Sequence, residues 1–330
     1  MADAVLSASP FARFIAILGR GPGRSRALTR EEAREAFGMV LSGGADPHQV
    51  GAFLMLLRFR GEDVAEVTGM VEAARTAFEL GRGDLGAALD WPSYGAGRTR
   101  GAPWFLLAAL ALARAGIAIL MHGSNEFSSA VTVRQGLDAL GLRPCAGFAA
   151  ASAALRADRF AYLQVEAMAP GLGALLDMRR LFGLRSPVNT VARLLNPADA
   201  PAGVDGVFHP PYIAVHLGVA QCLRRERLLV LKGGGGEAEH IPLKRTTAHL
   251  WDASAGHSEV TLPAADSLPP PDRKDETPAL LAGVWRGETA PPLPIATVQA
   301  TIALGLLAVR QAETPEQASD QARDIWAARH

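Results

Sequence analysis

The first eighty residues place apolar side chains three and four positions apart, which is the spacing of amphipathic helices. Thr29 followed by Glu32 has the pattern of a capping box, and Asp46-Pro47 combines a cap residue with a proline at the first helical position. We therefore expect short helices with short loops, forming a helical domain over residues 1–80.

From residue 81 onward, short apolar runs alternate with helical patterns. The runs with the length and composition of buried strands are Leu89–Trp91, Ile117–Met121, Phe160–Val165, Val204–Phe208 and Leu228–Leu231. The helices expected between them are Trp104–Ala115, Ser129–Leu140, Phe148–Arg156, Gly171–Phe182, Val188–Leu195 and Pro211–Arg224. Such alternation is typical of a mainly parallel sheet covered by helices.

The end of the chain changes pattern. Thr246–Trp251 and Ser258–Leu262 are expected to pair as a hairpin, and two helices, Ala296–Ala312 and Thr314–Ala328, follow proline-rich connectors. The predicted fold class is therefore α/β. A small N-terminal helical bundle domain precedes a large α/β domain, residues 81–330, whose mainly parallel central sheet is flanked by helices.

The best-defined strand-to-helix connection runs from Gly116 to Leu142. Its apolar run ends at Met121 and is followed by a polar turn that begins with His122, after which Ser128 or Ser129 could cap a helix. Free backbone N–H groups at such a helix start bind anions. An ordinary connection without a ligand has the same pattern, so the spacing alone leaves both interpretations open.

Composition narrows the function classes. The chain is 49% hydrophobic and 20% charged with no net charge, so it is globular and any nucleic-acid binding needs a local basic patch. Cys145 and Cys222 have no metal-binding or disulfide spacing, and the N-terminus has no signal-peptide pattern. Arg114 and Gly116 interrupt the most apolar stretch, which predicts a buried helix and strand instead of a membrane span. We expect a cytoplasmic protein.

One loop of the helical region is rich in glycine and arginine. Arg20, Arg24 and Arg26 lie among glycines, and arginine binds phosphate oxygens with two parallel hydrogen bonds. Two interpretations are open, a solvated basic loop or an outer contact for a phosphorylated ligand.

A run near the middle of the chain carries a family resemblance. Residues 179–190 read RRLFGLRSPVNT and lead to Leu194-Leu195-Asn196-Pro197, and His122-Gly123 with Asn125 forms a second shared turn. In both places the chain resembles the anthranilate phosphoribosyltransferases, glycosyltransferase family 3. The resemblance implies the nucleoside phosphorylase/phosphoribosyltransferase fold, and it implies that Arg179 contacts the carboxylate of an aromatic acceptor. It also implies a homodimer that forms through the helical domain. A segment near residues 170–195 is expected to join this helical domain.

The chain departs from the family where the family performs its chemistry. The Gly-Thr-Gly-Gly-Asp turn of the family corresponds to residues 94–98, where Gly95 and Gly97 remain and the acid is replaced by Arg98. The Asp-Glu pair that binds magnesium in the family corresponds to Glu237-Ala238-Glu239, which separates the two acids by one residue. The residues that add positive charge near these motifs are Arg100, Lys232, Lys244 and Arg245.

These departures predict direct binding of phosphate without a metal cofactor. The first interpretation is a protein with a degraded magnesium and pyrophosphate site that binds single-stranded DNA or RNA non-specifically through a basic cleft. The chain then resembles a paralogous DNA-binding branch of the family that lacks anthranilate phosphoribosyltransferase activity. The expected contacts are Gly95, Gly97, Arg98, Arg100, His122, Gly123, Asn125, Arg179, Lys232, Lys244 and Arg245, with Arg20, Arg24 and Arg26 as an outer loop.

The second interpretation is an active enzyme. By resemblance it is a magnesium-dependent pentosyltransferase that uses phosphoribosyl pyrophosphate on an unknown acceptor, with Glu237 and Glu239 as metal ligands. A third interpretation is a structural or regulatory protein with a vestigial pocket. Dependence on magnesium separates the first two, because a direct phosphate binder does not need the ion.

Overall fold

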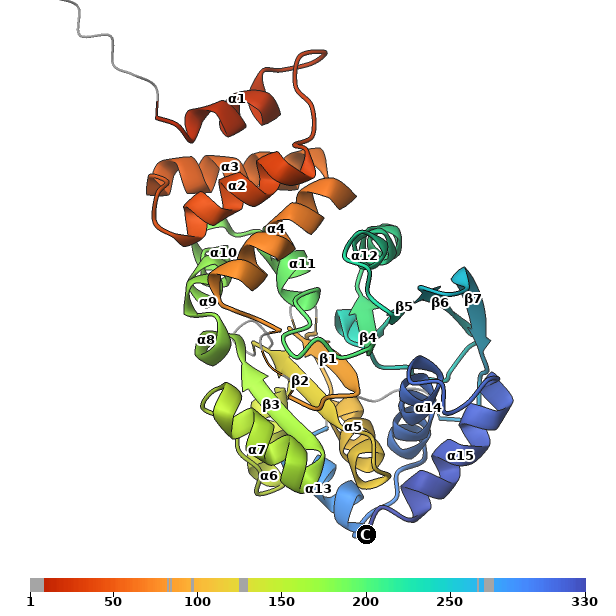
Figure 1. The fold of residues 1–330 in the computed structure, drawn as a ribbon. Helices are drawn as coiled ribbons and strands as arrows, with labels where there is room; N and C mark the ends of the chain where they lie inside the picture. The colour runs from red at the N-terminus through yellow and green to blue at the C-terminus, as the bar shows by residue number, and fades with distance from the viewer. Residues whose placement is uncertain are drawn as a thin grey trace, which may run out of the picture.

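The computed structural model describes residues 9–81, 83, 85–95, 98–124, 130–265, 267–269 and 276–330. The N-terminal helices are α1 (Ala12–Gly19), α2 (Arg30–Leu41), α3 (Pro47–Arg60) and α4 (Val64–Ala77). Capping boxes start α2, α3 and α4 at Thr29, Asp46 and Asp63, so the local signals at Thr29 and Asp46 are confirmed. Figure 1 shows this helical domain at one end of the molecule.

A seven-stranded sheet forms the centre of the large domain. Its strands are β1 (Leu89–Ser93), β2 (Ile119–Gly123), β3 (Phe160–Gln164), β4 (Ala202–Val207), β5 (Arg227–Lys232), β6 (Thr246–Asp252) and β7 (Gly256–Leu262). They lie in the order β3-β2-β1-β4-β5-β6-β7, and the first five are parallel to one another. β6 and β7 pair antiparallel at one edge, which confirms the predicted hairpin.

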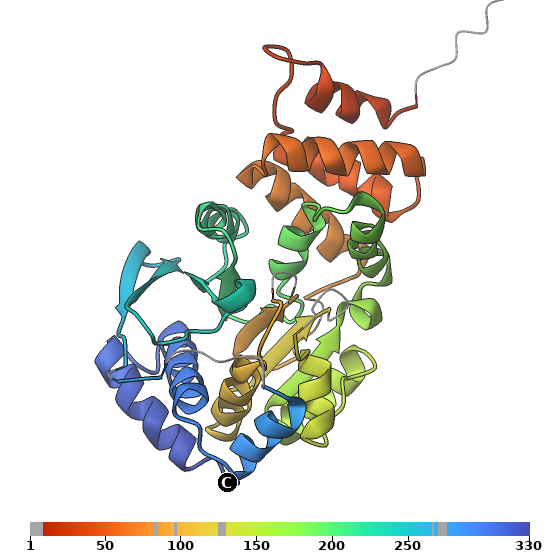
Figure 2. The same ribbon diagram turned by 180° about the vertical axis from the view of Figure 1, so that it is seen from behind.

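Helices cover both faces of this sheet (Figure 2). Leu229 and Leu231 pack on the side of α5 (Trp104–Arg114) and α14 (Pro292–Ala308), whereas Leu228 and Val230 face the opposite core, as alternation along a strand requires. The other helices of this domain are α6 (Val133–Ala139), α7 (Phe148–Asp158), α12 (Pro211–Cys222), α13 (Pro278–Arg286) and α15 (Pro315–Ala327). The predicted α/β fold class is therefore confirmed.

Four short helices connect the two parts of the molecule. They are α8 (Val165–Met168), α9 (Pro170–Asp177), α10 (Arg179–Phe182) and α11 (Val188–Arg193), and α9, α10 and α11 lie beside the N-terminal helices (Figure 1). Across this contact Gly51 of α3 faces the ring of Phe182. The domain boundary at residue 80, and the grouping of residues 170–195 with the helical domain, stay predictions.

Several predicted boundaries were wrong. α6 begins at Val133 with Thr132 as its cap, because Gln135 completes a capping box there; the expected caps Ser128 and Ser129 lie outside the described residues. The helix predicted over Gly171–Phe182 is two helices, α9 and α10. α13 was missed because proline-rich connectors flank it.

No helix among the described residues is both long and apolar enough to cross a membrane.

Candidate functional site

A pocket of about 290 Å³ lies where the carboxyl end of β4 meets the helical part of the molecule. Ligands of open α/β sheets bind at this edge. Its walls come from the end of α3, the turn after β1, the α10–α11 segment, the end of β4 and the start of α12. The charged and ionisable lining residues are Arg58, Glu62, Tyr94, Arg179, Arg185, Arg193, His209, Tyr212 and His216.

Four arginines give this pocket its electrostatic character. Burial, followed by the repulsion from Arg179, Arg193 and Arg58, lowers the pKa of Arg185 to about 10. Arg58 lies beside Glu62 and Arg193 beside Asp205 and Glu237, and the repulsion that remains among the four like charges falls when an anion binds between them. The pocket is therefore built to receive an anion, and Arg179 is one of the predicted contacts that lines it.

Glu62 is the one acidic side chain among the described residues that line the pocket. It receives hydrogen bonds from the hydroxyls of Thr190 in α11 and Tyr212 in α12, and it lies 3.8 Å from Nη1 of Arg58. Burial raises the pKa of Glu62 above its usual value, against the effect of these hydrogen bonds. A buried carboxylate with a raised pKa in a pocket is a candidate proton acceptor.

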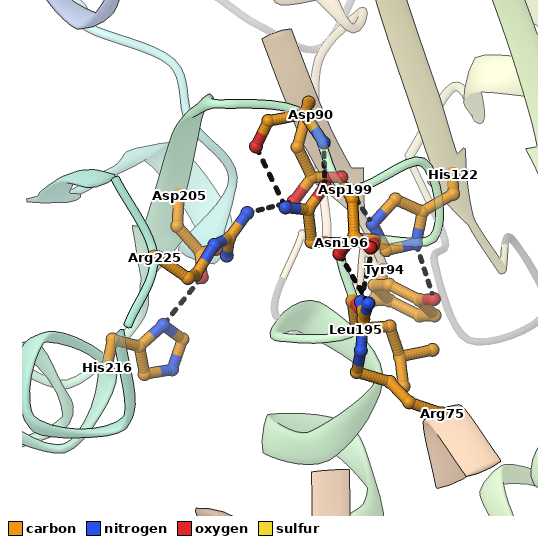
Figure 3. A network of polar contacts seen from close by, with 11 residues as sticks. Arg75, Asp90, Tyr94, His122, Leu195, Asn196, Asp199, Asp205, His216 and Arg225 are labelled. Atoms are coloured by element: carbon orange, nitrogen blue, oxygen red, sulfur yellow. Dashed lines mark hydrogen bonds and ion pairs between the residues drawn. The ribbon is translucent and has the colours of Figure 1, made fainter. Parts of the chain in front are cut away.

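A buried chain of polar contacts lies behind the pocket wall (Figure 3). The hydroxyl of Tyr94 lies 2.9 Å from Nδ1 of His122, whose Nε2 is 3.2 Å from Asp90, and Arg225 donates to Asp90 at 2.8 Å. Burial acts to raise the pKa of Asp90, but its contacts with His122 and Arg225 hold it below its usual value. These buried contacts fix the position of Tyr94 in the pocket wall.

A second buried group joins α11 to the sheet. Nδ1 of His216 lies 2.6 Å from Asp205 of β4, also drawn in Figure 3, and Nη1 of Arg193 lies 3.6 Å from the other oxygen of Asp205. Nη2 of Arg193 lies 3.4 Å from Glu237. Glu237 also accepts the backbone N–H of Gly95. Arg193 therefore lies between two carboxylates.

Glu239 and Arg98 face each other inside the protein. Nη2 of Arg98 lies 3.9 Å from Glu239, and Glu239 accepts the backbone N–H of Phe105 at 3.2 Å. Arg98 also donates to the carbonyl of Ala102, and its exposed fraction is 5%. We expected Arg98 to contact a phosphate backbone, but the structure directs it to internal acceptors.

The predicted residues near β2 are also buried. His122 and Gly123 belong to β2 and not to a turn after it, and His122 has no exposed surface. A side chain at Gly123 would collide with the carbonyl of Ser93, so close strand packing explains this glycine. Gly97 and Asn125 lie outside the described residues.

Four predicted basic residues are exposed along the carboxyl edge of the sheet. Arg100 follows β1, and Lys232 ends β5. Lys244 and Arg245 precede β6, which starts at this same edge because it is antiparallel to β5. The structure therefore brings these four residues to one side of the sheet.

The outer loop does not line the pocket. Arg20, Arg24 and Arg26 lie between α1 and α2, at the end of the helical domain away from the sheet (Figure 1). Arg26 is paired with Glu32 at 2.6 Å. Its predicted role as an outer contact for a phosphorylated ligand stays a prediction.

Sequence reasoning missed Asp90, Tyr94, Arg193, Asp205 and Glu62 as site residues. Asp90 and Asp205 carried a usable signal, because each is a charged residue within an apolar strand. Glu62 gave no such signal in the sequence, since it follows an exposed helix end.

Two domain models match this sequence in the same order as the two parts of the fold. The helical bundle domain of the glycosyl transferase family matches residues 12–78, and the a/b domain of the glycosyl transferase family matches residues 105–325. The chain belongs to this glycosyl transferase family. The family resemblance drawn from residues 179–197 is therefore confirmed.

Curated relatives in this family carry transferase names. An anthranilate phosphoribosyltransferase of Anaeromyxobacter sp. (strain Fw109-5) is 28% identical over 293 residues, which is 84% of each chain. That of Rhizobium meliloti (strain 1021) is 32% identical over 235 residues, covering 71% of this chain and 69% of its own. These relatives give no support to the expected likeness to a DNA-binding branch.

Solved structures with the same fold include anthranilate phosphoribosyltransferases. That of Thermus thermophilus has a TM-score of 0.78 at 24% identity and covers 97% of this chain and 95% of its own. That of Saccharomyces cerevisiae, in complex with PRPP and Mg, has a TM-score of 0.78 at 16% identity and covers 98% and 95%. At these identities the likeness shows the fold alone.

The residues of this glycosyl transferase family member do not fit a magnesium ion at the acids that the sequence pattern marked. Glu237 and Glu239 are buried, and each is paired with an arginine and a backbone N–H. The described residues also contain no group of three histidine, cysteine or acidic side chains that could hold a metal.

Proposed function

We propose that this protein is a phosphoribosyltransferase-type enzyme whose pocket at the carboxyl end of β4 binds phosphoribosyl pyrophosphate together with an anionic acceptor. The observation that carries the proposal is the cluster of Arg58, Arg179, Arg185 and Arg193 on that one pocket. Arginine binds phosphate and carboxylate oxygens in the same bidentate way. The transferase names of the relatives support the choice of donor.

The pocket residues suit the transfer step. A nucleophilic N–H or O–H group of the acceptor forms a bond to C1 of the ribose while the bond from C1 to pyrophosphate breaks and its electron pair leaves with pyrophosphate. The arginines offset the charge that develops on the leaving group. Glu62 would accept the proton of the acceptor, because it is the acidic residue of the pocket and its raised pKa suits proton uptake.

The test uses calorimetric titration of phosphoribosyl pyrophosphate into the protein, followed by release of pyrophosphate with anthranilate and other aromatic carboxylates. Arg179 and Arg180 are adjacent in α10 and provide a matched pair, since Arg179 lines the pocket whereas Arg180 is exposed beside Asp177. We expect Arg179→Gln to weaken donor or acceptor binding about tenfold or more, because it removes charged hydrogen bonds. Arg180→Gln should bind as the wild type does. Absence of both binding and pyrophosphate release in the wild type would overturn the proposal.

One observation favours a second candidate, which is non-specific binding of single-stranded nucleic acid. The exposed Arg100, Lys232, Lys244 and Arg245 extend positive charge along the sheet edge beyond the pocket, which suits a polymer better than a small molecule. The burial of Arg98 and the zero net charge weigh against it.

A titration of a labelled single-stranded oligonucleotide at low and moderate salt separates the two candidates. Binding that falls steeply with salt and is lost in a Lys244→Gln/Arg245→Gln variant supports the polymer. Arg20→Gln is the matched control, because this exposed arginine lies on the outer loop. Tight binding of phosphoribosyl pyrophosphate without binding of the oligonucleotide leaves the enzyme as the function.

A further inference from the structure

The guanidinium of Arg193 lies between two carboxylates that come from different parts of the sheet. Asp205 is in the middle of β4 and Glu237 follows the glycine turn after β5. Nη1 and Nη2 of Arg193 lie 3.6 Å and 3.4 Å from these carboxylates, and both acidic side chains are 1% exposed. The last residue of α11 thus reaches a position at the carboxyl edge of the sheet that is enclosed by negative charge.

The surroundings of these two acids require a cation. A buried carboxylate without a partner is costly, and two side by side are more so. Asp205 also lies 2.6 Å from Nδ1 of His216, and Glu237 also accepts hydrogen bonds from the N–H of Gly95 and from the side chain of Ser93. Burial raises the pKa of Glu237, and the charge of Arg193 is the largest of the effects that lower it.

The backbone keeps Glu237 in this position. A Cβ on Gly206 of β4 would lie 2.1 Å from the carbonyl carbon of Glu237, and a Cβ on Gly233 would lie 1.6 Å from its oxygen. These two glycines allow the turn after β5 to pack directly on β4. The carboxylate of Glu237 therefore approaches Arg193 from a rigid support.

We propose that Arg193 fills the position of a cation between Asp205 and Glu237, so that the phosphorylated ligand of the adjacent pocket meets a fixed guanidinium in place of a divalent metal ion. Arg193 lines that pocket as well as facing the acids, so the same side chain serves both. Arg98 occupies the corresponding place beside Glu239. The inference concerns the cation and stands whether or not the ligand is phosphoribosyl pyrophosphate.

The first measurement is binding of Mn²⁺, followed by electron paramagnetic resonance and by calorimetry, to the wild type and to Glu237→Gln. We expect no binding to the wild type at this site and no difference between the two proteins. Binding of Mn²⁺ to the wild type that Glu237→Gln abolishes would overturn the inference, because the ion would then share the site with Arg193.

The second measurement uses Arg193→Met, which removes the charge and retains much of the length of the side chain. This variant should gain Mn²⁺ binding, and the ion should raise its melting temperature by about 2 °C or more. A variant that folds only with Mn²⁺ supports the inference equally. A folded Arg193→Met that binds no Mn²⁺ would overturn it, since the acids would then not form a cation position.

Two controls make the result specific. Arg225→Met removes another buried arginine, but it leaves Asp90 with His122 and no second carboxylate, so it should gain no Mn²⁺ binding. Arg193→Lys keeps the charge, so it should also bind no Mn²⁺, and it tests the inference independently if Arg193→Met does not fold. Mn²⁺ binding to Arg193→Lys would count against the inference, because a retained positive charge should exclude the ion.

Discussion

The Tyr94 hydroxyl lies 2.9 Å from Nδ1 of His122, and this contact joins the wall of the pocket to the carboxyl end of β2. Neither side chain is more than 3% exposed, so water does not compete for the hydrogen bond. Burial raises the pKa of Tyr94 well above its usual value, and the hydroxyl therefore stays protonated and acts as a donor or as an ordering group.

Replacement of Tyr94 by Phe should destabilise the fold by about 1–3 kcal/mol, because it leaves a buried imidazole nitrogen without its partner. Urea unfolding of Tyr94→Phe, His122→Gln and the double variant measures the coupling between the two side chains. We expect about 1 kcal/mol of coupling energy. Additive effects of the two substitutions would show that the hydrogen bond contributes nothing to stability.

Glu62 should make the stability of the protein depend on pH. Its pKa is raised in the folded state above the value of about 4.3 in the unfolded chain, so the folded state holds the proton more tightly. Its contribution to stability is therefore greatest below a pH of about 4.3 and is lost as pH rises through the folded pKa. Urea unfolding should show that the wild type becomes less stable relative to Glu62→Gln as pH rises through the folded pKa of Glu62. Glu31→Gln, at an exposed position of α2, should show no such change.

His240 should make the stability of the protein depend on pH in the opposite direction to Glu62. Burial lowers its pKa to about 4, whereas an imidazole in the unfolded chain has a pKa near 6.5. The folded state then binds fewer protons than the unfolded state, so stability falls as pH decreases from about 6.5 to 4, by about 3 kcal/mol. Urea unfolding of His240→Gln should lack this loss, whereas His257→Gln, at an exposed position, should retain it. An unchanged pH profile in His240→Gln would contradict the prediction.

Replacement of two glycines of the helical domain by alanine should change the stability of the protein in opposite directions. A Cβ on Gly69 of α4 would lie 2.1 Å from the carbonyl oxygen of Arg30 at the start of α2, whereas a Cβ on Gly38 of α2 would meet nothing within 4 Å. Gly69→Ala should therefore cost about 1–3 kcal/mol or more by separating the helices. Gly38→Ala should stabilise the protein by about 0.5–1 kcal/mol, because alanine lowers the conformational entropy of the unfolded chain. Thermal unfolding of both variants tests the pair, and a loss of stability in Gly38→Ala would contradict it.

The sequence by itself determined the elements that depend on near neighbours. Capping boxes at Thr29 and Asp46 need only residues three positions apart, and the strands of the sheet were visible as apolar runs bounded by turns. Residues 179–190 and 194–197, together with the turn at His122-Gly123, carried the family resemblance, because these are local motifs. The predicted helix boundaries were wrong where several residues could cap or interrupt a helix, as at Thr132 and Met178.

The tertiary structure decided which charges face the ligand. Arg98 and Arg179 are both basic residues within motifs of the family, yet packing directs Arg98 to Glu239 and leaves Arg179 on the pocket. Glu237 was predicted as a metal ligand from its neighbours in sequence, but its partner Arg193 lies forty-four residues away. The cost of a buried charge depends on every group that the fold brings around it, and that arrangement is not present in the local order of the residues.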